Sequence, residues 1–294
     1  MARWRPPGKV SILSCLGAGF GLCVREPVAI LIWGFLTECW LLVVTPLASH
    51  PAAPQLTQAS RASLPATDLL KYLAATIDIR GLAVGMLSLM FFSVITCAAY
   101  RAIVRPADRS FAYLRIGPIE AMLSLSVLAW IGWPFILPIL GGLVVVTGIG
   151  AELRTASTGG TPMMWISLLV GFVTVFLGPV ISLWLVLRIS LLGPMSVDRG
   201  RVPFSDAWRL SQGRVWALFA LSIGVWAIEA IWLFLGNLPI GRLGLSWTPA
   251  LTPGFLGAFA VGGVCAGVGS AMGAAPWARA YRNLIGEDPS SAFE

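Results

Sequence analysis

Residues 215–235 read VWALFALSIGVWAIEAIWLFL, an apolar stretch whose single charged residue is Glu229. A helix needs about twenty consecutive apolar residues to cross the hydrocarbon core of a bilayer. In lipid a helix is also favoured because it satisfies its backbone hydrogen bonds internally. The stretch therefore predicts a transmembrane helix, and it sets the fold class for the rest of the chain.

Similar apolar stretches predict five more spans. They lie at about 27–47, 82–100, 119–149, 163–187 and 255–275. The third stretch is longer than one span requires and contains Pro134 and Pro138. We favour one kinked, tilted helix there over a span followed by a short re-entrant piece. The predicted fold is an all-α, polytopic membrane helical bundle of about six transmembrane helices, which forms a single membrane domain over 1–294.

The composition of the chain supports a membrane location. Of the 294 residues, 57% are hydrophobic and 11% are charged, and the mean hydropathy is +0.84. A soluble protein of this length cannot bury so much apolar surface in one core. The net charge of +7 comes largely from arginines beside apolar runs. We assign these charges to membrane topology and lipid headgroups, and we expect no nucleic-acid binding.

The basic residues also predict the orientation of the chain. Fifteen of the 20 fall in segments on one side of six spans, and the other five fall on the opposite side. Loops rich in Lys and Arg remain in the cytoplasm. Both termini are therefore expected to be cytoplasmic.

Two amphipathic segments are expected to lie in the membrane interface on the cytoplasmic side. The first covers about 10–24, where Ser14, Ala18 and Gly21 share one helical face. A cleaved signal peptide is the alternative for this segment, although no clear cleavage site follows it. The second segment covers about 203–212, with Ser205 as a plausible N-cap.

The residues between 188 and 214 include candidate contacts for anionic lipid headgroups. An arginine near a membrane surface contributes about 1 kcal/mol to such binding. The candidates are Arg188, Arg199, Arg201, Arg209 and Arg214. Ordinary anchoring by the positive-inside rule explains the same residues equally well.

Two carboxylates fall in the interior of predicted spans. Glu38 lies in the first span and Glu229 in the fifth. A carboxylate at such depth is costly unless it faces protein or water or takes up a proton. The pair is therefore a candidate intramembrane polar site for a proton, a cation or a polar headgroup. A hydrogen-bonded role in helix packing is the alternative.

The sixth span is rich in glycine. Gly263 with Gly267, and Gly269 with Gly273, form two G-x-x-x-G pairs. This spacing lets two helix backbones approach each other closely. The four glycines are a candidate helix-packing face, either within the bundle or between two chains.

The chain lacks the motifs of common catalytic and cofactor sites. It contains no G-x-S-x-G or nucleotide-binding glycine motif, and His50 is its single histidine. Its five cysteines form no C-x-x-C pair, which argues against a zinc or redox centre. We therefore expect no enzymatic activity, no catalytic or metal site and no cofactor.

Three segments resemble a known group of membrane proteins. They read FGLCVREPVAILIWGF from residue 20, FAYLRIGPIE from residue 111 and LRISLLGPMSVDRGRVPFSDAWRLSQGRVWALF from residue 187. They are similar to uncharacterised bacterial six-helix integral membrane proteins related to the membrane domain of glycerophosphoryl diester phosphodiesterases. In fused members the phosphodiesterase activity belongs to a separate soluble domain, so the resemblance implies a membrane module without that activity. It also points to a bacterial inner membrane.

Two functional hypotheses follow. The leading one is a non-enzymatic integral membrane protein that associates with or organises lipids or a larger membrane complex. Its expected partners are membrane lipids, anionic ones among them, and a membrane-protein partner or a second copy of the chain. The alternative is a small-solute or ion-coupled transporter that uses Glu38 and Glu229. A transporter of this kind requires both carboxylates in one wet cavity.

Overall fold

The computed structural model describes residues 10–48, 79–126, 177–242 and 252–286, together with residues 165, 166, 169, 170, 172 and 173. All regular structure in these residues is helical, and none of it is strand. The prediction of an all-α fold is confirmed.

The helical elements follow one another along the chain. They are α1 (Ile12–Arg25), α2 (Pro27–Ala48), α5 (Ile79–Val104), the 3-10 turn η1 (Ser110–Tyr113), α8 (Gly178–Ile189), α9 (Leu192–Arg199), α10 (Phe204–Leu210), α11 (Val215–Arg242) and α12 (Pro253–Ile285). A further helical stretch covers 118–126. The segments predicted as helices at 10–24 and 203–212 are present as α1 and α10.

Five stretches among the described residues are long and apolar enough to cross a membrane. They are Pro27–Leu47, Ala83–Val104, Gly178–Arg199, Val215–Trp232 and Pro253–Ile285. This is the architecture of a multi-pass membrane protein. Most of the predicted third span at 119–149 lies outside the described residues.

Helical structure continues beyond the ends of two predicted spans. The fourth was expected to stop at 187, but after a turn at 190–191 the chain continues as α9. The sixth was expected to stop at 275, whereas α12 continues through Pro276 to Ile285. The apolar run ends near these positions. A helix can continue beyond an apolar run, because long charged side chains on its surface can extend into water.

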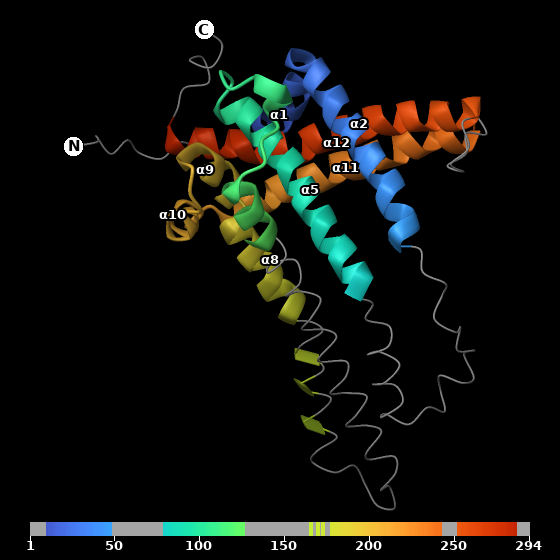
Figure 1. Cartoon of the computed structure of the whole chain (residues 1–294). Coiled ribbons are helices and arrows are strands. Elements are labelled where there is room, and N and C mark those ends of the chain that lie inside the picture. Colours follow the sequence, from blue (N-terminus) through green and yellow to red (C-terminus); the bar gives the residue numbers. More distant parts are fainter. Residues whose placement is uncertain are drawn as a thin grey trace, which may run out of the picture. The chain divides into compact units, whose positions relative to one another are not determined.

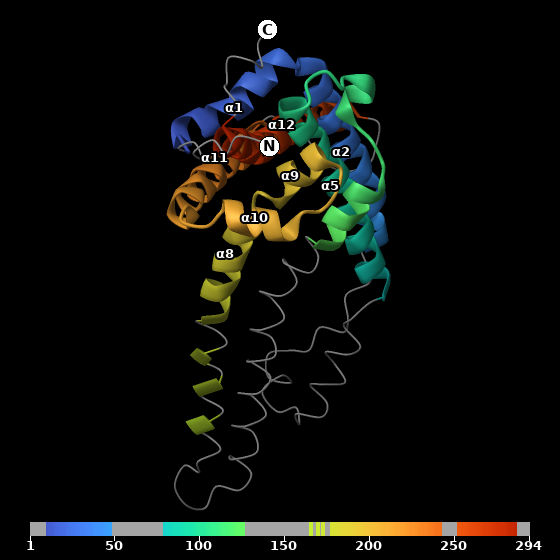
Figure 2. The ribbon, with the colours of Figure 1, turned by 90° about the vertical axis from the view of Figure 1, so that its left-hand side faces the viewer.

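The chain divides into two compact units. One contains 1–44, 89–124 and 187–294, and the other contains 45–88 and 125–186. The contacts described below lie within the first unit. Its central element is α12, which packs against α1 and α11. Figures 1 and 2 show α11 running alongside α12, and Figure 1 shows α2 crossing α12.

Glycine brings the backbones of α2 and α12 into contact. A Cβ added to Gly34 of α2 would lie 2.8 Å from the Gly267 nitrogen and would overlap the Gly263 carbonyl. A Cβ added to Gly267 would lie 3.0 Å from the carbonyl carbon of Ile30 and overlap its oxygen. Such close approach between helices requires small residues at the crossing.

The loop after α5 contains a left-handed turn. Phe111, Ala112 and Tyr113 have φ values of 50°, 54° and 64°. Each such non-glycine residue costs about 1–3 kcal/mol. The Trp33 indole donates a 2.9 Å hydrogen bond to the Ala112 carbonyl, and Arg101 donates one of 3.1 Å to the Tyr113 carbonyl. These bonds tie the turn to α2 and α5.

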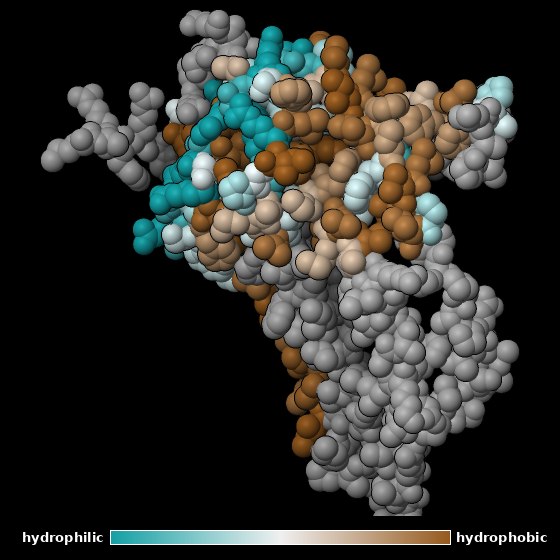
Figure 3. Space-filling model, in the orientation of Figure 1, coloured by the Kyte–Doolittle hydropathy of each residue, from teal (hydrophilic) through white to brown (hydrophobic). Residues whose placement is uncertain are grey.

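Hydrophobic side chains cover the outer surface of several helices. Val28, Leu31 and Phe35 of α2 are all exposed. Figure 3 shows hydrophobic side chains along α2 and α8, whereas hydrophilic ones gather where the loop after α5, α9 and α10 lie. Exposed apolar helix faces of this kind are expected where lipid is the surrounding solvent.

Candidate functional site

A groove opens between α1, the C-terminal end of α5 and the C-terminal part of α12. Its volume is about 720 Å³. Small residues of α1 and three arginines line it, and the lining includes Ser14, Gly17, Ala18, Gly21 and Arg25 of α1, Ile103 of α5, and Arg279 and Arg282 of α12. We call this site the arginine groove.

The small residues of α1 create the space in the groove. Gly17 and Gly21 share one helical face, and a Cβ added to either would have no atom within 4 Å. Gly19 lies on a different face, where an added Cβ would be 2.7 Å from the Met272 sulfur and 3.0 Å from the Met272 Cα. α1 therefore packs tightly on α12 through Gly19 and leaves room beside Gly17 and Gly21.

Two of the arginines are positioned by the end of α5. Arg25 donates a 2.5 Å hydrogen bond to the Ala102 carbonyl, and Arg282 donates one of 3.2 Å to the Ile103 carbonyl. The last carbonyls of a helix have no partner within the helix, and the helix dipole favours cations beside them. The end of α5 therefore fixes two guanidinium groups at the groove.

The positive charge of the groove is only partly neutralised. Arg279 makes no hydrogen bond or ion pair with any residue that the structure describes. Arg25 lies 3.9 Å from the Glu26 carboxylate. That carboxylate also accepts hydrogen bonds from Arg109 (2.9 Å) and from the Tyr113 hydroxyl (3.1 Å). Burial raises the pKa of Tyr113, so its hydroxyl remains neutral and can donate.

The nearest thiol adds no negative charge. Burial raises the pKa of Cys15 to about 11, although Arg279 and a hydrogen bond from Asn283 act to lower it. The thiol is therefore neutral at pH 7. None of the described residues that line the groove is acidic. These lining residues therefore carry a net positive charge.

This arrangement suits binding better than catalysis. Guanidinium groups form paired hydrogen bonds with phosphate and carboxylate oxygens. The small side chains of α1 leave an apolar surface beside these groups. In the described part of the chain, no three His, Cys, Asp or Glu side chains lie close enough to hold a metal ion. The groove is complementary to an anionic group attached to an apolar chain.

The arginines predicted as headgroup contacts between 188 and 214 do not line the groove. Two of them are engaged within their own segment. Arg199 forms an ion pair with Asp206. The guanidinium carbon of Arg188 lies 5.3 Å from the centre of the Trp208 ring, a cation–π geometry.

The other three arginines of this segment differ in their surroundings, and part of the segment is buried. Arg201 and Arg209 are exposed, and Arg214 donates a 3.0 Å hydrogen bond to the Leu210 carbonyl. α9 buries several of its side chains in the first unit. The hydroxyl of Tyr281 in α12 donates a 2.7 Å hydrogen bond to Asp198 of α9.

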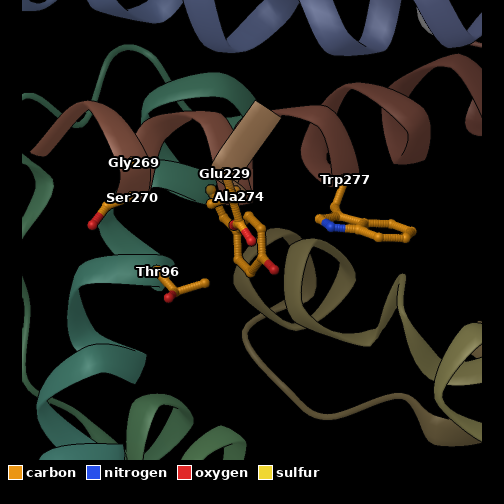
Figure 4. A pocket seen from close by; sticks show the side chains of 8 residues that line it. Thr96, Glu229, Gly269, Ser270, Ala274 and Trp277 are labelled. Carbon is orange, nitrogen blue, oxygen red and sulfur yellow. The ribbon is translucent and has the colours of Figure 1, made fainter. Parts of the chain in front are cut away.

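The structure does not bring Glu38 and Glu229 together in one cavity. Glu38 is 5% exposed, and its Oε2 atom has no hydrogen-bond partner among the described residues. Glu229 lines a separate pocket between α5, α11 and α12, and Glu38 is absent from that lining. Figure 4 shows Glu229 between Thr96 and Ser270 on one side and Trp277 on the other.

The two G-x-x-x-G pairs lie on different faces of α12. Gly263 and Gly267 face α2 at the backbone crossing described above. Gly269 and Gly273 face α11, and an added Cβ at Gly273 would overlap the Glu229 carboxylate. Both pairs therefore meet helices of the same chain.

Sequence reasoning did not single out Arg25, Arg279 and Arg282 as a group. They are far apart in the chain, and each stands at the end of an apolar run, where a basic residue is common. The sequence did contain one pattern that involves the groove: small residues of α1 and Arg25 recur on one helical face. The convergence itself depends on how α1 and α12 pack.

No family model, curated protein or solved structure matches the chain. The resemblance to the membrane domain of glycerophosphoryl diester phosphodiesterases therefore stays a prediction. The site has to be interpreted from its own geometry.

Proposed function

We propose that this chain is a non-enzymatic integral membrane protein that binds an anionic phospholipid in the arginine groove. The observation that carries the proposal is the convergence of Arg25, Arg279 and Arg282 on a groove in which no described lining residue is acidic. At about 1 kcal/mol for each basic residue, three arginines favour an anionic over a neutral headgroup by about 3 kcal/mol. This corresponds to roughly a 100-fold difference in affinity.

The groove also offers a surface for the lipid's hydrocarbon. Leu13, Phe20 and Val24 of α1 are exposed, with 84%, 54% and 84% of their surface accessible. Val24 lines the groove, and Leu13 and Phe20 lie on the neighbouring face of the same helix. A lipid with its phosphate at the arginines can extend its acyl chains along this side of α1.

The orientation of the chain is part of the proposal. The distribution of basic residues supports cytoplasmic termini, which would place the groove at the cytoplasmic leaflet. That leaflet is where anionic lipids create a negative surface potential. We place the protein in a bacterial inner membrane.

A lipid-dependent unfolding experiment tests the proposal. A ligand that binds the folded state at a hundred times its Kd stabilises it by about 2.7 kcal/mol. We expect phosphatidylglycerol to raise the Tm of the detergent-solubilised protein by several degrees, and phosphatidylcholine to raise it much less. The Arg279→Gln variant should lose about a third of this difference, because it removes one of the three charges. Equal shifts with both lipids would overturn the proposal.

Transport of a small solute or ion is the second candidate function. The pocket at Glu229 favours it, because a carboxylate inside a span is costly unless it has a role. Glu38 does not contribute to that pocket. The candidate therefore rests on Glu229, and a flux assay in proteoliposomes with the Glu229→Gln variant tests it.

A further inference from the structure

The pocket at Glu229 has a character opposite to that of the arginine groove. It lies between α5, α11 and α12 and has a volume of about 380 Å³. The side chains that define its chemistry are Thr96, Tyr100, Glu229, Ser270 and Trp277. Among the residues that the structure describes, no basic one lines it. We call this site the Glu229 pocket.

Glu229 supplies the charge of the pocket. It lies in α11 within the candidate span Val215–Trp232. It makes no hydrogen bond or ion pair within the described ranges of the chain. A carboxylate at this depth requires a proton or a cationic partner.

Two of the hydroxyl groups that line the pocket with Glu229 donate their protons to backbone carbonyls of their own helices. Thr96 donates its hydroxyl proton to the Phe92 carbonyl at 2.8 Å, and Ser270 donates its proton to the Ala266 carbonyl at 2.9 Å. A hydroxyl has one proton to donate and can still accept. The oxygens of both residues are therefore available to a donor in the pocket, in addition to the Glu229 carboxylate.

The aromatic residues select among cations. Tyr100 and Trp277 both line the pocket, and aromatic faces attract organic ammonium groups. A divalent metal ion usually needs several carboxylate or carbonyl ligands, whereas this pocket offers one carboxylate. A primary ammonium group carries three donors and one positive charge, which matches one carboxylate and neighbouring acceptor oxygens.

We infer that the Glu229 pocket binds a primary ammonium group. The Glu229 carboxylate pairs with the charge, and Thr96 and Ser270 accept hydrogen bonds from it. Tyr100 and Trp277 flank the carbon chain next to the ammonium. The group belongs either to a free amine or to the ethanolamine headgroup of a phospholipid. This inference is independent of the arginine groove, because the two sites share no lining residue.

Binding of phenethylammonium to the full-length protein in nanodiscs tests the inference. Its neutral analogue 2-phenylethanol controls for hydrophobic binding. We expect phenethylammonium to bind the wild-type protein and 2-phenylethanol to bind at least tenfold more weakly. The Glu229→Gln variant should bind phenethylammonium at least tenfold more weakly than wild type. The Glu38→Gln variant changes the other membrane carboxylate and should remain within twofold of wild type.

The Thr96→Val variant provides a second test that preserves the carboxylate and the side-chain shape. It removes one acceptor, and we expect a two- to fivefold loss of phenethylammonium affinity.

A competition experiment identifies the source of the ammonium group. If phosphatidylethanolamine in the nanodisc displaces phenethylammonium, the group belongs to a lipid headgroup. If it does not displace phenethylammonium, the group belongs to a free amine. Equal binding of the amine and the alcohol, or unchanged affinity in Glu229→Gln, would overturn the inference.

Discussion

Two parts of α12 face small residues of the neighbouring helices in different ways. Near its middle, the backbones of Gly263 and Gly267 meet α2, and no space remains for a Cβ on Gly34 or on Gly267. Near its C-terminus, α12 faces the part of α1 where Gly17 and Gly21 leave open space beside arginines. One contact is tight and dry, and the other is concave and charged.

This difference shows that glycine spacing alone does not reveal what glycine does in a membrane protein. At the crossing of α2 and α12 the missing side chain permits backbone contact. At the groove the missing side chain leaves a volume that a ligand can occupy. Substitutions that add a side chain should therefore damage the fold at the first place and binding at the second.

The largest effect is expected at the helix crossing. Gly34→Leu would force a side chain into the backbone of Gly263 and Gly267. Overpacking of a core costs about 1–3 kcal/mol and can exceed this where backbone must move. We expect a strong loss of folded protein, measured by size-exclusion chromatography and Tm in detergent. A Gly34→Leu variant with wild-type Tm would contradict the described crossing.

Charge reversal at the groove should have the next largest effect. Arg279→Glu removes one favourable charge and adds an unfavourable one, a change of about 2 kcal/mol. Affinity for phosphatidylglycerol should fall roughly 30-fold, as measured by titration of lipid into nanodiscs or detergent micelles. Tm without added lipid should change little, because Arg279 makes no hydrogen bond or ion pair in the described structure.

Filling the groove should reduce lipid affinity without loss of stability. Gly21→Leu places a side chain in space that contains no protein atom within 4 Å of the Cβ position. We expect phosphatidylglycerol affinity to fall about tenfold, as a bound acyl chain is displaced, while Tm remains close to wild type. The matched control is Gly19→Leu, which should lower Tm because Met272 occupies the space.

The smallest effect is expected at an exposed arginine outside the groove. Arg209→Glu makes the same change in net charge as Arg279→Glu, but Arg209 is on the surface of α10. Phosphatidylglycerol affinity should change less than threefold in the same titration. Equal losses in the two variants would show that lipid binding follows overall charge and not the groove.

The fold class could be predicted because the length of an apolar run is read directly from the order of the residues. The stretches at 27–47 and 215–235 correspond closely to candidate spans of the structure. Helix ends were predicted less well, since α12 continues through Pro276 into a basic segment. An interior proline in a membrane protein does not mark the end of a helix.

The candidate site was harder to predict, because it depends on which charges become buried. Arg101 and Arg282 were counted as topology charges, yet they are 6% and 7% exposed. Arg101 forms a buried ion pair with Glu120, a residue at the start of the predicted third span. No local pattern in the sequence distinguishes these residues from exposed arginines such as Arg209.

Native mass spectrometry of the protein released gently from its own membrane tests the lipid-binding proposal most directly. We predict one anionic phospholipid retained on each wild-type chain, and loss of that lipid from both Arg279→Glu and Gly21→Leu. The Arg209→Glu variant should retain it. A wild-type chain without lipid, or the same lipid occupancy in all variants, would contradict a binding site in the arginine groove.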